Sequence, residues 1–184
     1  MVKAGCTTRA GFTLVEILCV VVIVGIAAAV VVPQISSRDD LKAAASARVL
    51  MADLIYAQNR AITLQQAQYI RFDGTNQEYR LLTGPGITMI QHPVNKTDYV
   101  VRFGESGSGS MRETRLLATR FVGMSGNVQL ALAFDELGTP LACNLADNST
   151  ETLRSGYIQI QCGTQKLQIN VEPYTGQISV ENIP

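Results

Sequence analysis

The most suggestive chemistry in this sequence belongs to Phe12 and Glu16, which lie four positions apart at the start of a long apolar stretch. Gly11 precedes Phe12 and has no side chain to obstruct a peptidase. If the chain is cut between Gly11 and Phe12, the new amine is a cation on the same helix face as the Glu16 carboxylate. The carboxylate would neutralise that amine, or the amine of a neighbouring subunit, and the pairing would set the stagger between packed helices.

The element that must position this pair is the apolar run from Phe12 to Val32. As a helix, its residues would extend about 31 Å, which is close to the thickness of a bilayer's hydrocarbon core. Lys3 and Arg9 precede the run, and positive charge at that end keeps it in the cytoplasm. Pro33 follows the run and is expected to kink or end the helix. The pattern predicts a membrane helix over residues 12–33.

Two ordinary interpretations of this segment stay open on the residues alone. One is a plain single-pass anchor, and the other is a secretory signal peptide cleaved after the small residues 27–29. Both leave Glu16 without a partner, although a carboxylate deep in a bilayer costs about 2.5–3.5 kcal/mol on insertion scales. Because Glu16 lies only one turn inside, the cost is smaller there, but an intramembrane carboxylate still suggests a function.

The stretch from Gly11 to Glu16, followed by its apolar run, resembles the class III signal of type IV pilins and type II secretion pseudopilins. The resemblance implies that residues 1–11 are a leader, which a prepilin peptidase removes by cutting after Gly11. It also implies N-methylation of Phe12, a role for Glu16 in assembly, and a helix kink at Pro33. Residues 34–184 would then form a periplasmic domain of a protein anchored in the inner membrane by one span.

The remaining chain predicts an α+β fold, with a long helix packed on a mostly antiparallel sheet. Residues 36–64 contain no proline or glycine, and Leu50, Leu54, Ala57, Ala61 and Leu64 form a stripe that Met51, Ile55 and Ile62 widen. This amphipathic helix is expected to continue the first one. Alternating residues then predict strands at 67–72, 79–82, 99–103, 128–134, 157–162, 166–171 and 177–180.

This order of elements resembles the GspH/FimT group, through residues 43–72, the turn at 134–138 and the ending 171–177. The resemblance implies a minor pseudopilin, a structural subunit that joins other pseudopilins in a filament for protein export. The alternative is a FimT-like minor type IV pilin that serves pilus assembly or DNA uptake. DNA-binding members have a basic Gly-Arg-x-Arg stretch, whereas this chain has Gly176-Gln177-Ile178-Ser179, so nucleic-acid binding is not expected.

Cysteines provide one further expectation in the distal domain. Cys143 and Cys162 lack CxxC spacing and have no histidine near them in sequence, which argues against zinc. In the periplasm that the resemblance implies, these two residues are expected to form a disulfide, with two buried thiols as the alternative.

The sequence predicts no enzyme, cofactor or metal site. His92 is the single histidine and precedes a proline in an expected surface loop, so a serine–histidine or cysteine–histidine pair would depend on it. Asp135 and Glu136 lie in a predicted turn, and Asp39 and Asp40 are expected to cap a helix. The glycine-rich residues 104–110 lack the ending of a phosphate-binding loop. No acidic loop matches the calcium site of major pseudopilins.

Overall fold

The computed structural model describes residues 12–36, 39–84, 88–105 and 109–183 of the 184-residue chain. The chain divides into two compact units, Met1–Arg38 and Asp39–Pro184, which are considered separately below. The predicted leader, residues 1–11, lies outside the described residues, and so does the junction at residues 37–38.

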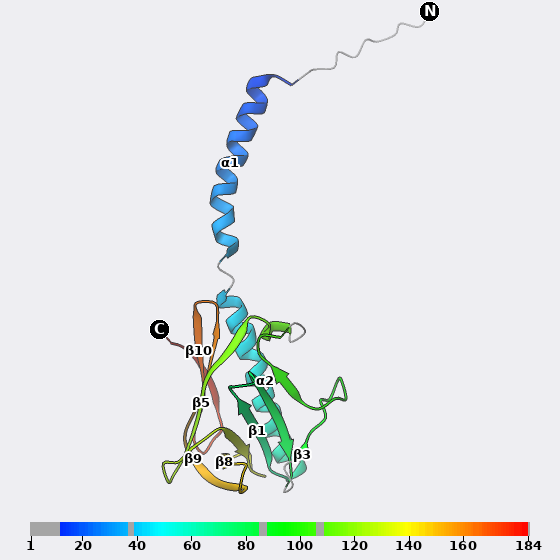
Figure 1. Cartoon of the computed structure of the whole chain (residues 1–184), viewed down its shortest axis with the longest axis vertical. Helices are drawn as coiled ribbons and strands as arrows, with labels where there is room; N and C mark the ends of the chain where they lie inside the picture. Colours follow the sequence, from blue (N-terminus) through cyan, green and yellow to red (C-terminus); the bar gives the residue numbers. More distant parts are fainter. Residues whose placement is uncertain (1–11, 37–38, 85–87, 106–108, 184) are drawn as a thin grey trace, which may run out of the picture. The chain divides into compact units, whose positions relative to one another are not determined.

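Unit 1 contains a single described helix, α1 (Leu14–Ser36), which is coloured blue in Figure 1. The helix continues through Pro33 for three more residues, and the kink expected there stays a prediction. Every side chain from Phe12 to Ala29 is exposed. Within the described parts of the chain, no helix combines the length and apolarity that crossing a membrane requires.

Unit 2 begins with α2 (Asp39–Leu64), which confirms the predicted amphipathic helix. One face is buried and consists mainly of small side chains, which allow the helix to approach the sheet closely: Ala43, Ser46, Ala47, Leu50, Leu54, Ala57 and Ala61. The expected stripe was wrong at Ile55, Ile62 and Leu64, which are 42–47 % exposed. Ile55 and Ile62 lie at the border of the buried face, and Leu64 is in the last turn of the helix.

The described residues of unit 2 form an 11-stranded sheet in which neighbouring strands are antiparallel. The main strand order is β11-β10-β9-β8-β7-β1-β2-β3, with β4 beside β2, and with β5 between β9 and β6. The strands are β1 (Gln68–Asp73), β2 (Glu78–Thr83), β3 (Thr88–Met89), β4 (Val100–Arg102), β5 (Thr114–Gly123), β6 (Val128–Gln129), β7 (Ala131–Phe134), β8 (Pro140–Asn144), β9 (Ser149–Cys162), β10 (Gln165–Val171) and β11 (Ile178–Ile183). A short 3-10 helix, Gly109–Met111, precedes β5.

The long strand β9 connects two parts of this sheet. Its first residues, Ser149–Thr152, pair with β8, and its later residues, Gly156–Cys162, pair with both β5 and β10. The expected α+β class is therefore confirmed. The single strand expected at 128–134 was wrong, because the chain bends at Leu130 so that β6 pairs with β5 and β7 pairs with β1. The strands β3, β5 and β8 were not predicted, and β9 begins eight residues before the strand expected at 157–162.

The main core lies between α2 and the sheet (Figure 1). At its centre the ring of Phe72 contacts those of Tyr79 and Phe121, each at 5.7 Å between centroids. Tyr69 and Leu82 belong instead to a smaller second cluster, together with Ala131, Ala133 and Cys143. Since side chains alternate along a strand, these residues face the opposite side of the sheet from their neighbours in the main core.

The expected disulfide between Cys143 and Cys162 was wrong, because both thiols are free and buried in this structure. Cys143 belongs to the second cluster, whereas Cys162 belongs to the main core. The two residues are also far apart along the sheet. Cys143 of β8 is paired with Thr150 near the start of β9, whereas Cys162 is the last residue of β9. The alternative of two buried thiols is the one that the structure adopts.

Candidate functional site

The first turn of α1 is closed by Thr13, which precedes the helix as its N-cap residue. The Thr13 hydroxyl oxygen accepts a hydrogen bond from the backbone N–H of Glu16 at 3.2 Å, and the Thr13 carbonyl accepts one from Ile17 at 3.2 Å. This is half of a capping box, whose sequence signature is Ser or Thr followed three residues later by Glu. The sequence contains that signature at Thr13–Glu16, so this cap could have been predicted from the residues alone.

Two physical effects favour Glu16 in the first turn of α1. Its carboxylate lies in the first turn of α1, where a negative charge interacts favourably with the helix dipole. The cap uses only its backbone N–H, so its exposed side chain stays available for a partner outside the chain. Phe12 is 79 % exposed, and Gly11 lies outside the described residues. The cleavage, the N-methylation and the ion pair with a new amine therefore stay predictions.

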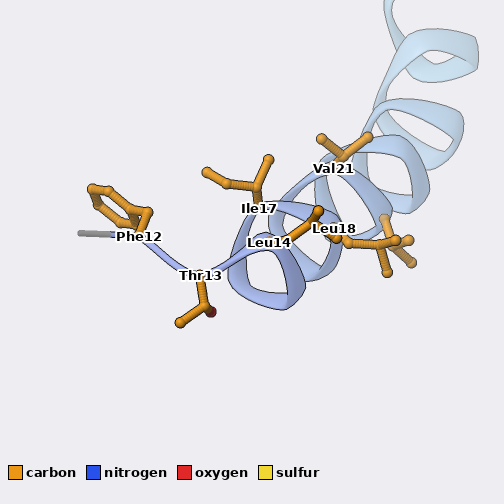
Figure 2. A pocket seen from close by; sticks show the side chains of 7 residues that line it. Phe12, Thr13, Leu14, Ile17, Leu18 and Val21 are labelled. Carbon is orange, nitrogen blue, oxygen red and sulfur yellow. The ribbon is translucent and has the colours of Figure 1, made fainter.

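An open apolar hollow of about 770 Å³ follows one side of the first turns of α1. It is lined by Phe12, Thr13, Leu14, Ile17, Leu18, Val21 and Val22. Figure 2 shows the ring of Phe12 on the same upper side as Ile17 and Val21, while Thr13 points away from them. No ionisable side chain is present in this lining, so the hollow offers an apolar contact surface rather than a place for chemistry.

From Leu14 to Ala29, every exposed side chain of α1 other than that of Glu16 is apolar. Leu14 and Val21, on one side of the helix, are 82 % and 65 % exposed, and Ile23, on the opposite side, is 65 % exposed. A helix that is apolar on all sides is stable when lipid or other apolar helices surround it. Its side chains are therefore suited to burial against lipid or against other apolar helices.

The predicted loop and turn residues of unit 2 have structural roles. The Asp135 carboxylate accepts hydrogen bonds from the backbone of Leu137 and Thr139, which confirms the turn expected at 135–138. The His92 Nδ1 accepts from the backbone N–H groups of Val94 and Asn95. Among the described residues, no hydroxyl or thiol is hydrogen-bonded to the His92 ring, so the structure does not assemble a nucleophile around it.

Asp39 and Asp40 were expected to cap α2, but they lie inside its first turn, and the residue before them lies outside the described residues. Ligand atoms of Asp39, Glu113 and Cys162 approach within 4.8 Å of one another, which sequence reasoning did not foresee. The Lys42 ammonium already pairs with Glu113 at 2.5 Å, and this hydrogen bond lowers the pKa of the Glu113 carboxyl. Burial raises the pKa of the Cys162 thiol. A protonated thiol and a neutralised carboxylate make a poor metal site.

The carboxylate of Asp53 is a second feature that the sequence did not reveal. It accepts hydrogen bonds from the hydroxyl groups of Tyr79 at 2.5 Å and Tyr99 at 2.8 Å. Burial raises the pKa of Asp53, although the two hydroxyl donors partly oppose this effect. Burial and the Asp53 charge also raise the pKa of both tyrosines, so all three groups hold their protons more tightly. These groups connect α2 to the sheet.

A second buried carboxylate, that of Glu78, is neutralised by Arg80 of its own strand β2 and by Arg102 of the neighbouring strand β4. Glu78 is 2 % exposed and pairs with Arg80 and with Arg102, the latter at 3.1 Å. Because both positive partners are partly exposed, this cluster satisfies a buried charge rather than presenting a free acid to a substrate.

Residues 6–32 match the family model described as the prokaryotic N-terminal methylation motif. The match includes Gly11, Phe12 and Glu16, so a prepilin-type N-terminus is confirmed over that range. Two solved structures of the minor pseudopilin EpsH from the type II secretion system of Vibrio cholerae are similar to this chain. One has a TM-score of 0.49 at 12 % identity and covers 77 % of this chain and 97 % of its own. The other has a TM-score of 0.48 at 14 % identity, with 76 % and 92 % covered.

No curated protein sequence matches this chain. The family model covers residues 6–11 of the predicted leader and most of α1, and it does not extend to unit 2.

Proposed function

We propose that this protein is a minor pseudopilin, a structural subunit of a type II secretion pseudopilus that takes part in protein export. The observation that carries the proposal is the N-terminal methylation motif over residues 6–32. It coincides with a capped helix whose apolar side chains are exposed on all sides. The motif supports processing by a peptidase, and the exposed helix supports burial in a larger assembly.

In this proposal residues 1–11 are a leader that a prepilin peptidase removes, and Phe12 is then methylated on its new amine. Residues 12–33 anchor the chain in the bacterial inner membrane before it joins other pseudopilins. Residues 34–184 form a periplasmic domain. Glu16 neutralises the new amine within one subunit or between two, since its side chain is not needed for the helix cap.

The proposed role is structural and not enzymatic. The carboxylates of Asp53 and Glu78 are hydrogen-bonded or paired inside the fold, and the His92 Nδ1 is occupied by its own loop. These interactions support a domain that presents a surface, since the groups most suited to catalysis hold the fold together. Neither the motif nor the geometry of unit 2 favours the FimT-like alternative.

Processing of the full chain in a host that has the prepilin peptidase tests the proposal. Intact mass and N-terminal analysis should give a chain that begins with N-methylated Phe12. A Gly11→Val variant should keep residues 1–11, because the side chain obstructs the peptidase. A matched Gly25→Ala variant should be cut normally, since a Cβ at Gly25 meets nothing within 4 Å.

Two results would contradict the proposal. The first is a mature chain that begins near Val30, as an ordinary signal peptide would leave it. The second is a chain that keeps Met1 although the peptidase is active on another substrate in the same cells. Deletion of the gene should also abolish secretion of the system's cargo, and intact secretion would exclude the export role.

A further inference from the structure

A polar hollow of about 480 Å³ lies in unit 2. Its lining comes from α2, from β2 and from the segment that follows β3, and it includes Tyr56, Arg60, Gln91, His92 and Lys96. No Asp or Glu is present among the described residues that line it. The hollow is therefore surrounded by hydrogen-bond donors and positive charge.

Arg60 is positioned by a hydrogen bond to the side chain of a buried glutamine, Gln68. The Arg60 Nε donates to the Gln68 side-chain oxygen at 3.2 Å, and Gln68 is 1 % exposed. The amide nitrogen of Gln68 donates in turn to the carbonyls of Gln66 and Ala67 and to the Thr83 hydroxyl, so its oxygen faces the arginine. This arrangement uses one of the five guanidinium N–H groups and leaves the terminal nitrogens for another acceptor.

The opposite wall of the hollow is the turn at residues 92–97, which is stabilised by hydrogen bonds within its own backbone. The His92 N–H donates to the Thr97 carbonyl at 2.8 Å, and the Lys96 N–H donates to the His92 carbonyl at 3.0 Å. The His92 ring contacts Tyr99 at 4.6 Å between centroids, and Tyr99 stacks on Tyr56 of α2 at 5.8 Å. Ring contacts through Tyr99 thus connect the turn with α2.

Arg60 and Lys96 form no ion pair among the described residues, whereas His92 interacts electrostatically with the Asp53 carboxylate. The ion pairs of the described chain involve other cations, namely Lys42, Arg80 and Arg102. The Asp53 carboxylate, which touches Tyr99, already accepts from two tyrosine hydroxyls. Since the His92 Nδ1 accepts from the backbone of its own loop, Nε2 is the ring nitrogen that can donate to a ligand.

We propose that this hollow binds a small oxyanion, a phosphate or carboxylate group, through Arg60, Lys96 and His92. A guanidinium group matches the geometry of such anions, and an ammonium group adds a point charge. The volume leaves room for the group that carries the anion, and Tyr56 supplies an apolar wall for it. This site does not depend on the N-terminal helix or on the proposed role in export.

The single histidine of the chain makes this binding measurable. The processed full chain, solubilised in detergent and labelled with 13C-histidine, gives one set of ring resonances. The sample carries no histidine tag. Inorganic phosphate is titrated in one arm and succinate in the other, at constant pH and with chloride keeping the ionic strength constant. Binding should shift the His92 resonances along a saturable curve in at least one arm.

A matched pair of variants separates the site from general charge. Arg60→Gln with Lys96→Gln should weaken the anion affinity at least about tenfold, because two charge-assisted donors are lost. Arg120→Gln with Arg154→Gln removes the same charge from exposed positions of β5 and β9 and should change the affinity less than about twofold. Lys96→Gln alone should also weaken anion binding. Because Lys96 lies in an exposed turn, this single variant tests the site even if the double variant folds poorly.

The outcomes decide the proposal in either direction. Saturation by phosphate alone, or by succinate alone, supports the site and names the chemistry of its ligand. Saturation by both supports a site for either group. The absence of a saturable shift with both anions up to millimolar concentrations would overturn it, and so would equal weakening by the two double variants.

Discussion

The side-chain amide of Gln58 donates a hydrogen bond to the backbone carbonyl of Gly138, 80 residues further along the chain, at 2.9 Å. The same amide nitrogen lies 3.2 Å from the Thr175 carbonyl. One residue of α2 thus connects the turn between β7 and β8 with the turn between β10 and β11. These are the segments on which the resemblance to the GspH/FimT group depends, and the structure brings them together at one side chain.

This contact requires glycine at position 176. Gly176 has a φ of +66°, and a Cβ there would lie 2.5 Å from the Gln58 amide nitrogen and 3.2 Å from the Gly138 carbonyl oxygen. We therefore predict that Gly176→Ala lowers the free energy of unfolding by roughly 1–3 kcal/mol. Urea denaturation of the detergent-solubilised protein measures the change. Gly74→Ala is the matched control, since a Cβ at that turn meets nothing within 4 Å. Equal stability of the two variants would contradict the role of the contact.

The raised pKa of Asp53 predicts a dependence of stability on pH. The folded state holds the Asp53 proton more tightly than the unfolded chain, whose carboxyl titrates near the ordinary value of 3.8. The contribution of this group is complete below that value and is lost as the pH rises through the higher pKa of the folded state. The free energy of unfolding of the wild type, measured relative to that of Asp53→Asn, should therefore fall as the pH rises from about 4.

Asp73 provides a control of opposite sign for this experiment. Hydrogen bonds from Asn76 lower the pKa of its carboxyl, so its contribution is present at neutral pH and is lost as the pH falls. Relative to Asp73→Asn, the wild type should lose stability towards acid. If both differences change in the same direction, burial of Asp53 does not dominate its titration.

The two distal thiols should stay reduced and unreactive in the folded protein. Burial raises the pKa of the Cys143 thiol to about 11, and that of Cys162 is raised by burial as well. Because the thiolate is the nucleophile, alkylation of both residues at pH 8 should be slow in the native state and rapid in denaturant. Mass spectrometry after alkylation counts the labels. A protein purified from the periplasm in which Cys143 and Cys162 resist labelling even when unfolded would show that they form a disulfide.

The geometry of the first turn of α1 separates the folding of this helix from its assembly. The cap uses the Thr13 hydroxyl and the Glu16 backbone, so Glu16→Val preserves it. We predict that Glu16→Val is processed at Gly11 but is impaired in incorporation into filaments, as fractionation and immunoblotting would reveal. Thr13→Val, which removes the cap at a cost of about 1 kcal/mol, should affect incorporation less. Normal incorporation of Glu16→Val would mean that the carboxylate has another purpose.

Much of the architecture follows from local patterns in the sequence. The stripe at Leu50, Leu54, Ala57 and Ala61 predicted the buried face of α2, because helical periodicity depends only on neighbouring residues. The alternating residues of β1, β2 and β10 predicted those strands for the same reason. The bend at Leu130 was missed, because the residues on both sides of it alternate without interruption and only their different partners, β5 and β1, separate them.

The N-terminal chemistry of this protein is a prediction that rests on the local sequence alone. Gly11, Phe12, Glu16 and the apolar run are consecutive, so their relationship does not depend on how the rest of the chain folds. Only the tertiary structure decided which distant groups meet. It placed Cys143 and Cys162 on opposite faces of a sheet, joined Asp53 to two tyrosines, and brought Arg60 to the turn that carries Lys96. Strand register and helix packing determine such contacts, and these depend on residues far apart in the chain.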